Sequence, residues 1–164
     1  MSFTGASILS IEQFSLGDVE RIFAVADQMQ PFANRERVTK ALDGAILGNI
    51  FLEPSTRTRI SFGSAFNLLG GHVRETADIS STAFVKGESL QDSARILSGY
   101  SDIICLRHPT SGSVEKFAKY SRVPVINGGD GANEHPTQAL LDLFTIKKEL
   151  RAKNRDINNL RIAL

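Results

Sequence analysis

The sequence is short of the features that mark membrane, secreted and nucleic-acid-binding proteins. Its single cysteine cannot form an internal disulfide, and no apolar run reaches the length of a membrane span. The first residues lack a basic region followed by an apolar core, so no secretion signal is expected. With 19 basic and 18 acidic side chains, the net charge of +1 supplies no field for nucleic acid or an anionic membrane. We therefore expect a cytoplasmic globular protein without nucleic-acid or membrane partners.

Convincing cofactor and metal motifs are also missing. No GxGxxG pattern with a downstream ribose-binding acid occurs, so Gly128, Gly129 and Gly131 most simply indicate a tight turn. No set of His, Cys, Asp and Glu shows metal-ligand spacing. Cys105 stands in an apolar run and is expected to be a small buried strand residue in a reducing compartment rather than a nucleophile. We expect neither a metal nor a cofactor.

What the sequence does contain is an alternation of strand-like and helix-like runs. Its 164 residues, 41% of them apolar, can bury one domain-sized core. Ser15 and Asp18 resemble a capping box that opens a first, amphipathic helix. The apolar face of this helix is expected to comprise Leu16, Val19, Ile22, Phe23, Ala26 and Met29.

Four strand-helix units are predicted after this first helix. The strands are expected at 45–52, 72–75, 103–106 and 123–126, and the helices that follow them at 60–69, 89–100, 113–120 and 136–150. Strands that are separated by helices and carry continuous apolar runs are typical of a parallel sheet. We therefore predict an α/β fold with a parallel sheet of about four strands, flanked by helices on both faces in a three-layer αβα arrangement.

The turn after the first predicted strand concentrates groups that bind anions. Residues 55–59 read Ser-Thr-Arg-Thr-Arg, with Ser55 where the N-cap of the next helix belongs. The free N–H groups of the first helical turn, the positive end of its dipole and Arg57 would then converge on one anion. The alternative is a capped helix with two solvated arginines, Arg57 and Arg59. The turn alone leaves both interpretations open.

Two further turns are expected at the same edge of the sheet. Arg107 follows the third predicted strand, and His135-Pro136 opens the last helix, with proline at its favoured first position. Ligands of open parallel sheets bind beyond the carboxyl ends of the strands, so the three turns are predicted to face one crevice. For His135, a plain helix-capping or turn histidine is the alternative interpretation.

The ordered set of motifs resembles the transcarbamoylase family. FLEPSTRTRISF (51–62) is similar to its carbamoyl-phosphate motif, LRHP (106–109) to its strand-end arginine motif, and NGGDGANEHPTQALLDLFTI (127–146) to its second signature. The resemblance implies that residues 1–150 are the carbamoyl-phosphate-binding domain of a two-domain protein. Residues 151–164 would be the connection and the first strand, at 160–164, of a truncated aspartate-binding domain; an edge strand of the same sheet is the alternative.

The resemblance also implies a reaction. The RHP, GDGANEHPTQALLDLFTI and KGESL segments look like the aspartate-type members, which transfer the carbamoyl group of carbamoyl phosphate to L-aspartate. The products would be N-carbamoyl-L-aspartate and phosphate, in de novo pyrimidine biosynthesis, and the 164-residue piece alone is expected to be inactive. The alternatives are an ornithine-type half and a non-catalytic phosphate-binding module.

Site residues are implied in the same way. The phosphate would be bound by Ser55, Thr56, Arg57 and Thr58. Thr58, Arg107 and His135 would surround the carbonyl oxygen as the catalytic donors, and Gln138 would contact the carbamoyl amide. His135 is then better regarded as an electrophilic donor than as a general base, because the departing phosphate can itself accept the proton of the amine.

The resemblance further implies a site shared between subunits of a homotrimer. Lys86 matches a family lysine that reaches into the neighbouring subunit, and Thr82 stands where the familiar members have serine. Glu53 corresponds to a glutamate that bridges to the second domain on closure; an ordinary exposed carboxylate is the alternative. Arg59 is expected to be a structural ion-pairing residue. The resemblance leaves open partner chains of regulatory or dihydroorotase type.

Overall fold

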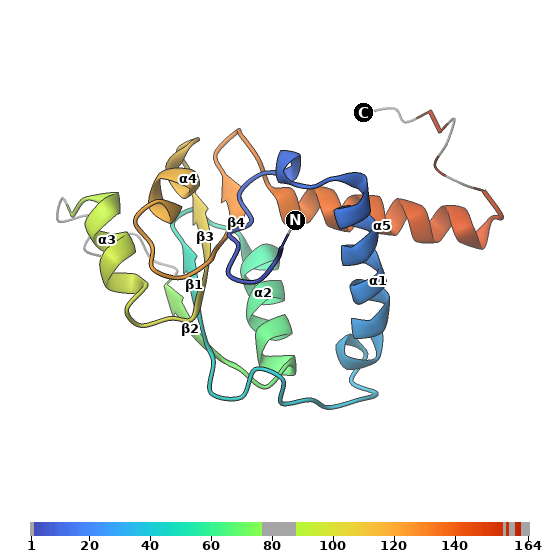
Figure 1. Cartoon of the computed structure of the whole chain (residues 1–164), viewed down its shortest axis with the longest axis horizontal. Helices are drawn as coiled ribbons and strands as arrows, with labels where there is room; N and C mark the ends of the chain where they lie inside the picture. The colour runs from blue at the N-terminus through green and yellow to red at the C-terminus, as the bar shows by residue number, and fades with distance from the viewer. Residues whose placement is uncertain (1, 77–87, 156, 158–159, 162–164) are drawn as a thin grey trace.

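The described residues form a four-stranded parallel sheet with helices on both faces (Figure 1). The computed structural model describes residues 2–76, 88–155, 157 and 160–161. Within these residues the strands are β1 (Ile46–Phe51), β2 (His72–Thr76), β3 (Ile103–His108) and β4 (Val125–Asp130), in the order β2-β1-β3-β4. The helices are the short 3-10 turn η1 (Ile11–Gln13), α1 (Leu16–Ala33), α2 (Thr56–Leu68), α3 (Leu90–Leu97), α4 (Ser113–Ala118) and α5 (Pro136–Ala152).

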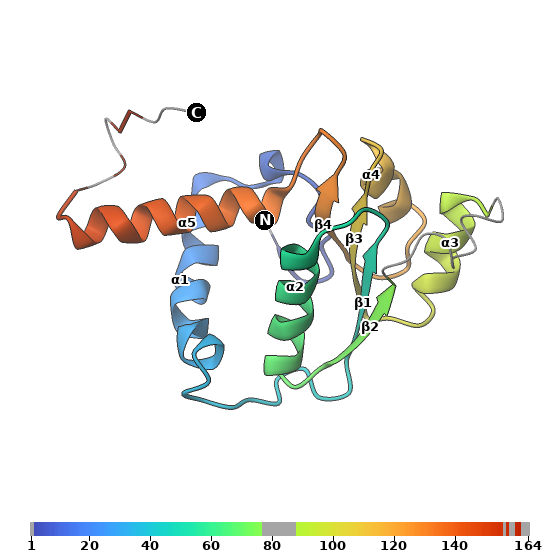
Figure 2. The ribbon, with the colours of Figure 1, turned by 180° about the vertical axis from the view of Figure 1, so that it is seen from behind.

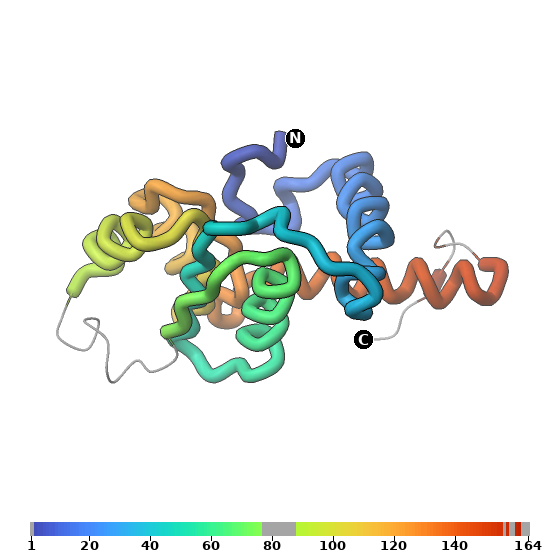
Figure 3. Tube along the Cα trace, turned by 90° about the horizontal axis from the view of Figure 1, so that it is seen from below, coloured from blue at the N-terminus to red at the C-terminus, as the bar shows by residue number. Residues whose placement is uncertain are grey.

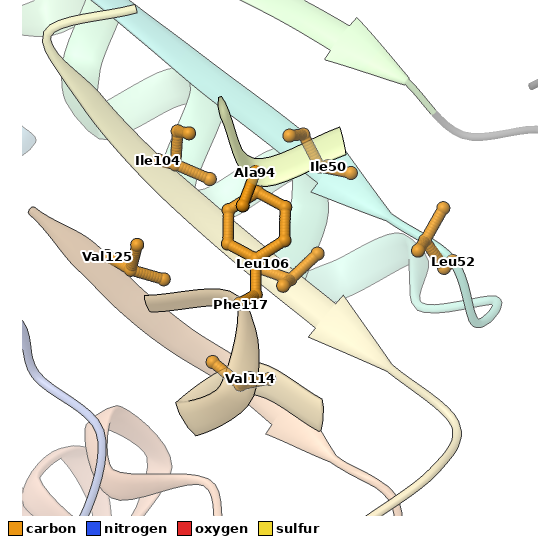
Figure 4. Packing of buried hydrophobic residues seen from close by; sticks show 8 residues of the cluster. All are labelled: Ile50, Leu52, Ala94, Ile104, Leu106, Val114, Phe117 and Val125. Carbon is orange, nitrogen blue, oxygen red and sulfur yellow. The ribbon is translucent and has the colours of Figure 1, made fainter. Parts of the chain in front are cut away.

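Hydrophobic clusters on both faces of the sheet define the three layers. Successive strand residues point to opposite faces, so Ile50 and Leu52 face one way and Leu47 and Phe51 the other. The larger cluster joins the sheet to α3 and α4 (Figure 4) and comprises Ile50, Leu52, Ala94, Ile104, Leu106, Val114, Phe117 and Val125. On the other face, Leu47, Phe51 and Cys105 pack with Phe62 and Phe66 of α2. This arrangement confirms the predicted three-layer fold.

The helices α1, α2 and α5 lie on the face opposite α3 and α4 (Figure 2). The last turns of α5 extend away from the sheet, at the end of the molecule farthest from α3 (Figure 3). The rings of Phe23 and Phe144 lie 5.3 Å apart and join α1 to α5. None of the helices among the described residues combines the length and the apolar character that a membrane span requires.

Local differences from the prediction have identifiable causes. The capping box of Ser15 and Asp18 is present, and Phe23 is buried, but Leu16 is 77% exposed and does not belong to the apolar face. Helix α2 begins at Thr56 rather than at 60. Its first turn is polar and has no apolar periodicity, so the apolar pattern did not reveal the true start of the helix. Residues 128–130 were expected to turn, but strand β4 runs on to Asp130, because Asp130 pairs with His108 of β3 after an irregularity in the register.

The structure also differs from the prediction at the carboxyl-terminal end of the chain. Helix α5 continues to Ala152, so Arg151 and Ala152 are helical rather than part of a connection. Leu160 and Arg161 are not paired in a strand, and residues 162–164 of the predicted strand lie outside the described residues.

The amino-terminal segment contributes a contact with no counterpart in the sequence prediction. Ile8 forms a parallel bridge with Ile126 of β4, and the Asn127 side chain donates to the carbonyl oxygen of Leu9 over 2.9 Å. This segment therefore lies along the edge of β4, directly before the loop that carries His135.

Candidate functional site

An open cleft of about 1180 Å³ lies beyond the carboxyl ends of β1, β3 and β4. Residues from all three turns line it: Ser55, Thr56, Arg57, Thr58, Arg107, His135 and Gln138, together with Thr137 and the apolar side chains Phe62, Ala65 and Leu141 among others. The expected convergence of the three turns on one crevice is confirmed. It arises because β1, β3 and β4 are neighbours in a parallel sheet and end at the same edge.

The amino terminus of α2 forms one wall of the cleft. Ser55 is its N-cap residue with extended backbone, and its side chain makes no capping hydrogen bond. The first N–H that closes a helical turn is that of Arg59, which donates to the carbonyl oxygen of Ser55 over 3.2 Å. The N–H groups of the first turn precede this bond, so they have no acceptor within the helix, and the positive end of the dipole faces the cleft. Arg57 is exposed in this turn.

Arg107 is held at the end of β3 by two fixed partners. One terminal nitrogen donates to the carbonyl oxygen of Gly128 over 3.1 Å, and the other lies 3.3 Å from a carboxylate oxygen of Glu53. The side chain of Arg107 is 19% exposed and that of Glu53 33%. The Nε atom of Arg107 is buried without a hydrogen-bond partner among the described residues. Glu53, which follows β1, thus fixes the guanidinium group of Arg107.

Gly129 provides the space that Arg107 occupies. Its φ of +127° is a conformation that residues with a side chain rarely adopt. A Cβ atom at this position would lie 2.5 Å from a terminal nitrogen of Arg107 and 2.9 Å from its Cζ atom. The glycine-rich run was interpreted only as a turn, so this packing role was missed. The glycine-rich run was visible in the sequence. Its packing role could not be inferred, because it depends on the side chain of Arg107 from β3.

His135 is the N-cap residue of α5, and its ring is oriented by its own helix. The Nδ1 atom accepts from the backbone N–H of Gln138 over 3.3 Å and lies 3.2 Å from the hydroxyl of Thr137. The Nε2 atom is buried and has no partner in the described part of the chain. Burial lowers the pKa of His135, the positive charge of Arg107 lowers it further, and the carboxylate of Asp142 opposes the shift. The ring is therefore neutral near pH 7.

The loop before His135 is anchored by the amino-terminal segment. The Glu134 carboxylate accepts from the hydroxyl of Ser10 and from the backbone N–H of Ile11, each over 2.7 Å. These contacts join residues more than 120 positions apart in the chain. The sequence prediction missed them because nothing local to Ser10 or Glu134 signals the pairing.

The remaining candidate residues are placed as follows. Gln138 lines the cleft, with its side-chain nitrogen donating to Asp142 over 2.9 Å. Arg59 lies 3.6 Å from a carboxylate oxygen of Glu75, which agrees with the structural ion pair expected for it. Thr82 and Lys86 lie outside the described residues.

The structure gives little support for a reactive thiol or a metal ion at this edge of the sheet. Cys105 is fully buried, and burial raises the pKa of its thiol far above the ordinary range. Among the residues that the structure describes, no group of three or more His, Cys, Asp and Glu side chains is arranged to hold a metal ion. The polar lining of the cleft consists instead of hydroxyl, amide and imidazole groups and the guanidinium groups of Arg57 and Arg107.

Comparisons with known proteins agree on one family. Residues 6–148 match the family model described as aspartate/ornithine carbamoyltransferase, carbamoyl-P binding domain. The chain is 69% identical over its whole length to the aspartate carbamoyltransferase catalytic subunit of Saccharophagus degradans, of which it covers 49%. It is 70% identical over its whole length to the corresponding subunit of Cellvibrio japonicus, of which it covers 48%.

Solved structures give the same result. Aspartate transcarbamoylase from Trypanosoma cruzi in complex with carbamoyl phosphate superposes with a TM-score of 0.84 at 41% identity, over 90% of this chain and 48% of that one. The complex of that enzyme with carbamoyl aspartate and phosphate has the same TM-score and identity, over 90% of this chain and 45% of that one. The chain thus spans about half the length of the relatives that it matches.

Proposed function

The chain belongs to the aspartate/ornithine carbamoyltransferase family, and from this premise we propose that it is the carbamoyl-phosphate-binding part of an aspartate carbamoyltransferase. Residues 1–150 form the carbamoyl-phosphate-binding domain, and residues 151–164 lead toward an aspartate-binding part. The whole enzyme transfers the carbamoyl group of carbamoyl phosphate to the amine of L-aspartate. The products are N-carbamoyl-L-aspartate and phosphate, in de novo pyrimidine biosynthesis.

The cleft supplies both requirements of this reaction. The phosphate, which is the leaving group, binds at the amino terminus of α2, where backbone N–H groups act with Ser55, Thr56, Arg57 and Thr58. Arg57 can offer two parallel donors to two phosphate oxygens. The carbonyl oxygen lies toward Thr58, Arg107 and His135, and these donors engage more strongly as the attacking amine drives negative charge onto that oxygen.

The observation that carries the proposal is the pair of buried nitrogens without partners, Nε of Arg107 and Nε2 of His135, on a cleft with a helix amino terminus. A buried donor without an acceptor is costly, so its presence in the free protein favours a role in binding a ligand. Donors that are already in place cost no reorganisation when the oxyanion forms. Losing one such donor typically costs about 2.7 to 4 kcal/mol of activation free energy.

His135 does not accept the proton of the attacking amine. The ring is neutral and its Nδ1 atom already accepts a backbone hydrogen bond, so the departing phosphate is the better acceptor. Gln138 accepts from the carbamoyl amide through its side-chain oxygen, while its side-chain nitrogen keeps the bond with Asp142. Glu53, which now pairs with Arg107, is free to exchange that partner for a group of the aspartate-binding part on closure.

A shared site in a homotrimer is part of the same proposal, as are a cytoplasmic location and regulatory or dihydroorotase partner chains. In it, Thr82 and Lys86 complete the cleft of a neighbouring subunit. Mixing inactive full-length subunits that carry Lys86→Ala with subunits that carry Arg57→Ala should restore activity, because some of the shared sites are then intact. No recovery after verified subunit exchange would contradict the shared site.

Binding tests the first half of the proposal on the 164-residue chain itself. Calorimetric titration should show carbamoyl phosphate binding to the unaltered chain and a sharp loss of affinity in Arg57→Lys, because an ammonium group cannot offer the fork of donors. The melting temperature should change little, since Arg57 is exposed. Arg59→Lys is the matched control, because Arg59 belongs to the same helical turn but pairs with Glu75. Equal affinities in all three proteins would refute the site.

Turnover tests the second half. Supplying the chain with an aspartate-binding half should produce N-carbamoyl-L-aspartate from carbamoyl phosphate and L-aspartate. Turnover with L-ornithine instead would favour the ornithine-type alternative. Binding of carbamoyl phosphate without turnover of either amine would indicate a non-catalytic phosphate-binding module.

A further inference from the structure

The hydrogen-bond partners of His135 determine which of its ring nitrogens carries the proton. The hydrogen of the Gln138 amide is fixed by the backbone and is shared between the Nδ1 atom of His135, at 3.3 Å, and the carbonyl oxygen of the same residue, at 3.0 Å. An N–H at Nδ1 would point its hydrogen at this donor. Nδ1 must therefore present its lone pair.

Thr137 supplies a second donor to the same lone pair. Its hydroxyl oxygen lies 3.2 Å from Nδ1 of His135, and a hydroxyl hydrogen rotates to suit its partner. A hydroxyl can also accept, so it is the Gln138 amide, which can only donate, that selects the tautomer, and the hydroxyl then donates to the lone pair that Nδ1 presents. A neutral imidazole carries one N–H, so the proton lies on Nε2, the buried atom without a partner among the described residues.

We propose that Thr137 is a positioning residue: the Gln138 amide selects the Nε2–H tautomer of His135 before any ligand binds, and the Thr137 hydroxyl holds the ring in place by donating to the lone pair of Nδ1. Its importance for carbamoyl transfer rests on the proposed function, because Nε2–H is the form that can donate to the carbonyl oxygen. The tautomer itself is a property of the free chain. Burial and the positive charge of Arg107 keep the ring neutral, so the choice between the two nitrogens remains decisive at neutral pH.

The direct test is nitrogen-15 NMR of the ligand-free chain labelled at histidine. The chain has three histidines, and spectra of His72→Gln and His108→Gln assign the signals of His135 by elimination. Near pH 7, we expect an unprotonated shift for Nδ1 of His135 and a protonated shift for Nε2. A protonated Nδ1, or two averaged shifts, would overturn the proposal without any variant of Thr137 having to fold.

Variants then test Thr137 itself. Thr137→Val should move the Nδ1 shift of His135 toward that of a nitrogen without a side-chain hydrogen bond while Nε2 stays protonated, and Thr137→Ser should restore the Nδ1 shift, because serine keeps the hydroxyl. Thr145→Val is the matched control on the same helix, since its hydroxyl bonds only to the carbonyl oxygen of Leu141 among the described residues. Unchanged His135 shifts in a folded Thr137→Val protein would overturn the role of Thr137.

Ligand discrimination gives a second readout. Because His135 faces the carbonyl oxygen and not the phosphate, Thr137→Val should weaken carbamoyl phosphate binding by about two- to tenfold, the worth of one neutral hydrogen bond, and leave inorganic phosphate binding unchanged. Equal weakening of both ligands would indicate a merely structural role and contradict the proposal. If the unaltered chain binds neither ligand but shows the Nε2–H tautomer, the proposed function fails and the inference on Thr137 stands.

Discussion

Replacing Gly129 with alanine tests how the cleft holds Arg107. The new Cβ atom would meet the guanidinium group at 2.5 Å from a terminal nitrogen and 2.9 Å from Cζ. These atoms are the far end of a flexible side chain, so the side chain moves and the sheet does not. Moving it breaks the bond to the carbonyl oxygen of Gly128 and the pairing with Glu53. Arg107 then no longer points its donors at the ligand.

Two separate costs are expected in Gly129→Ala. Holding alanine at a φ of +127° costs about 1 to 3 kcal/mol of folding free energy. For a chain of this size, that lowers the melting temperature by roughly 2 to 12 °C. Losing a charged hydrogen bond to the ligand costs about 1.5 to 3 kcal/mol, which raises the dissociation constant for carbamoyl phosphate roughly tenfold to 150-fold.

Gly44→Ala separates the two costs. Gly44 also has a positive φ, of +81°, but a Cβ atom there would meet nothing within 4 Å. This control should lose stability to a similar extent and keep its affinity for carbamoyl phosphate. Thermal unfolding and calorimetric titration of both variants, at a temperature where each is folded, give the comparison. Undiminished affinity in Gly129→Ala would refute the reasoning that this glycine makes room for a ligand-binding guanidinium group.

Two further predictions follow from burial. Burial lowers the pKa of His135 and of His108 below the ordinary value of about 6.5, so below that pH the unfolded chain binds more protons than the folded one and stability falls. The free energy of unfolding, measured by urea denaturation, should therefore decrease as the pH is lowered from about 7 to about 5, and less steeply in His135→Gln; an unchanged slope in that variant would contradict the burial of a neutral ring. The Cys105 thiol, whose pKa burial raises, should resist alkylation by iodoacetamide in the folded chain and react in denaturant, whereas rapid labelling of the folded chain would show that the strand opens.

The sequence predicts the parts of this molecule that have local signals. Alternating apolar runs indicate four strand-helix units, Ser15 and Asp18 mark the start of α1, and the Ser-Thr-Arg turn marks the start of α2. The parallel sheet then brings the turns after β1 and β4 to the end of β3 at one edge, so their convergence follows from topology. The residues that line the cleft could be named for this reason.

The features that the sequence does not predict depend on distant partners. Gly128 and Gly129 have low strand propensity, and they lie within β4 because the pairing with β3, which is irregular at these residues, resumes between Asp130 and His108. The space that Gly129 leaves has a meaning only once Arg107 fills it. Likewise, Ser10 and Glu134 form a hydrogen bond at the edge of the sheet, and no sequence pattern near either residue predicts it. Local propensity determines where the helices and strands form, whereas contacts between distant residues determine how the side chains of the site are held.

A crystal structure of the chain with a stable phosphonate analogue of carbamoyl phosphate tests the central claim most directly. The account predicts the phosphonate at the amino terminus of α2, within hydrogen-bond distance of the Arg57 guanidinium group, and the carbonyl oxygen within reach of Nε2 of His135. An analogue that contacts only one of these two residues, or that binds in a different part of the molecule, would contradict it.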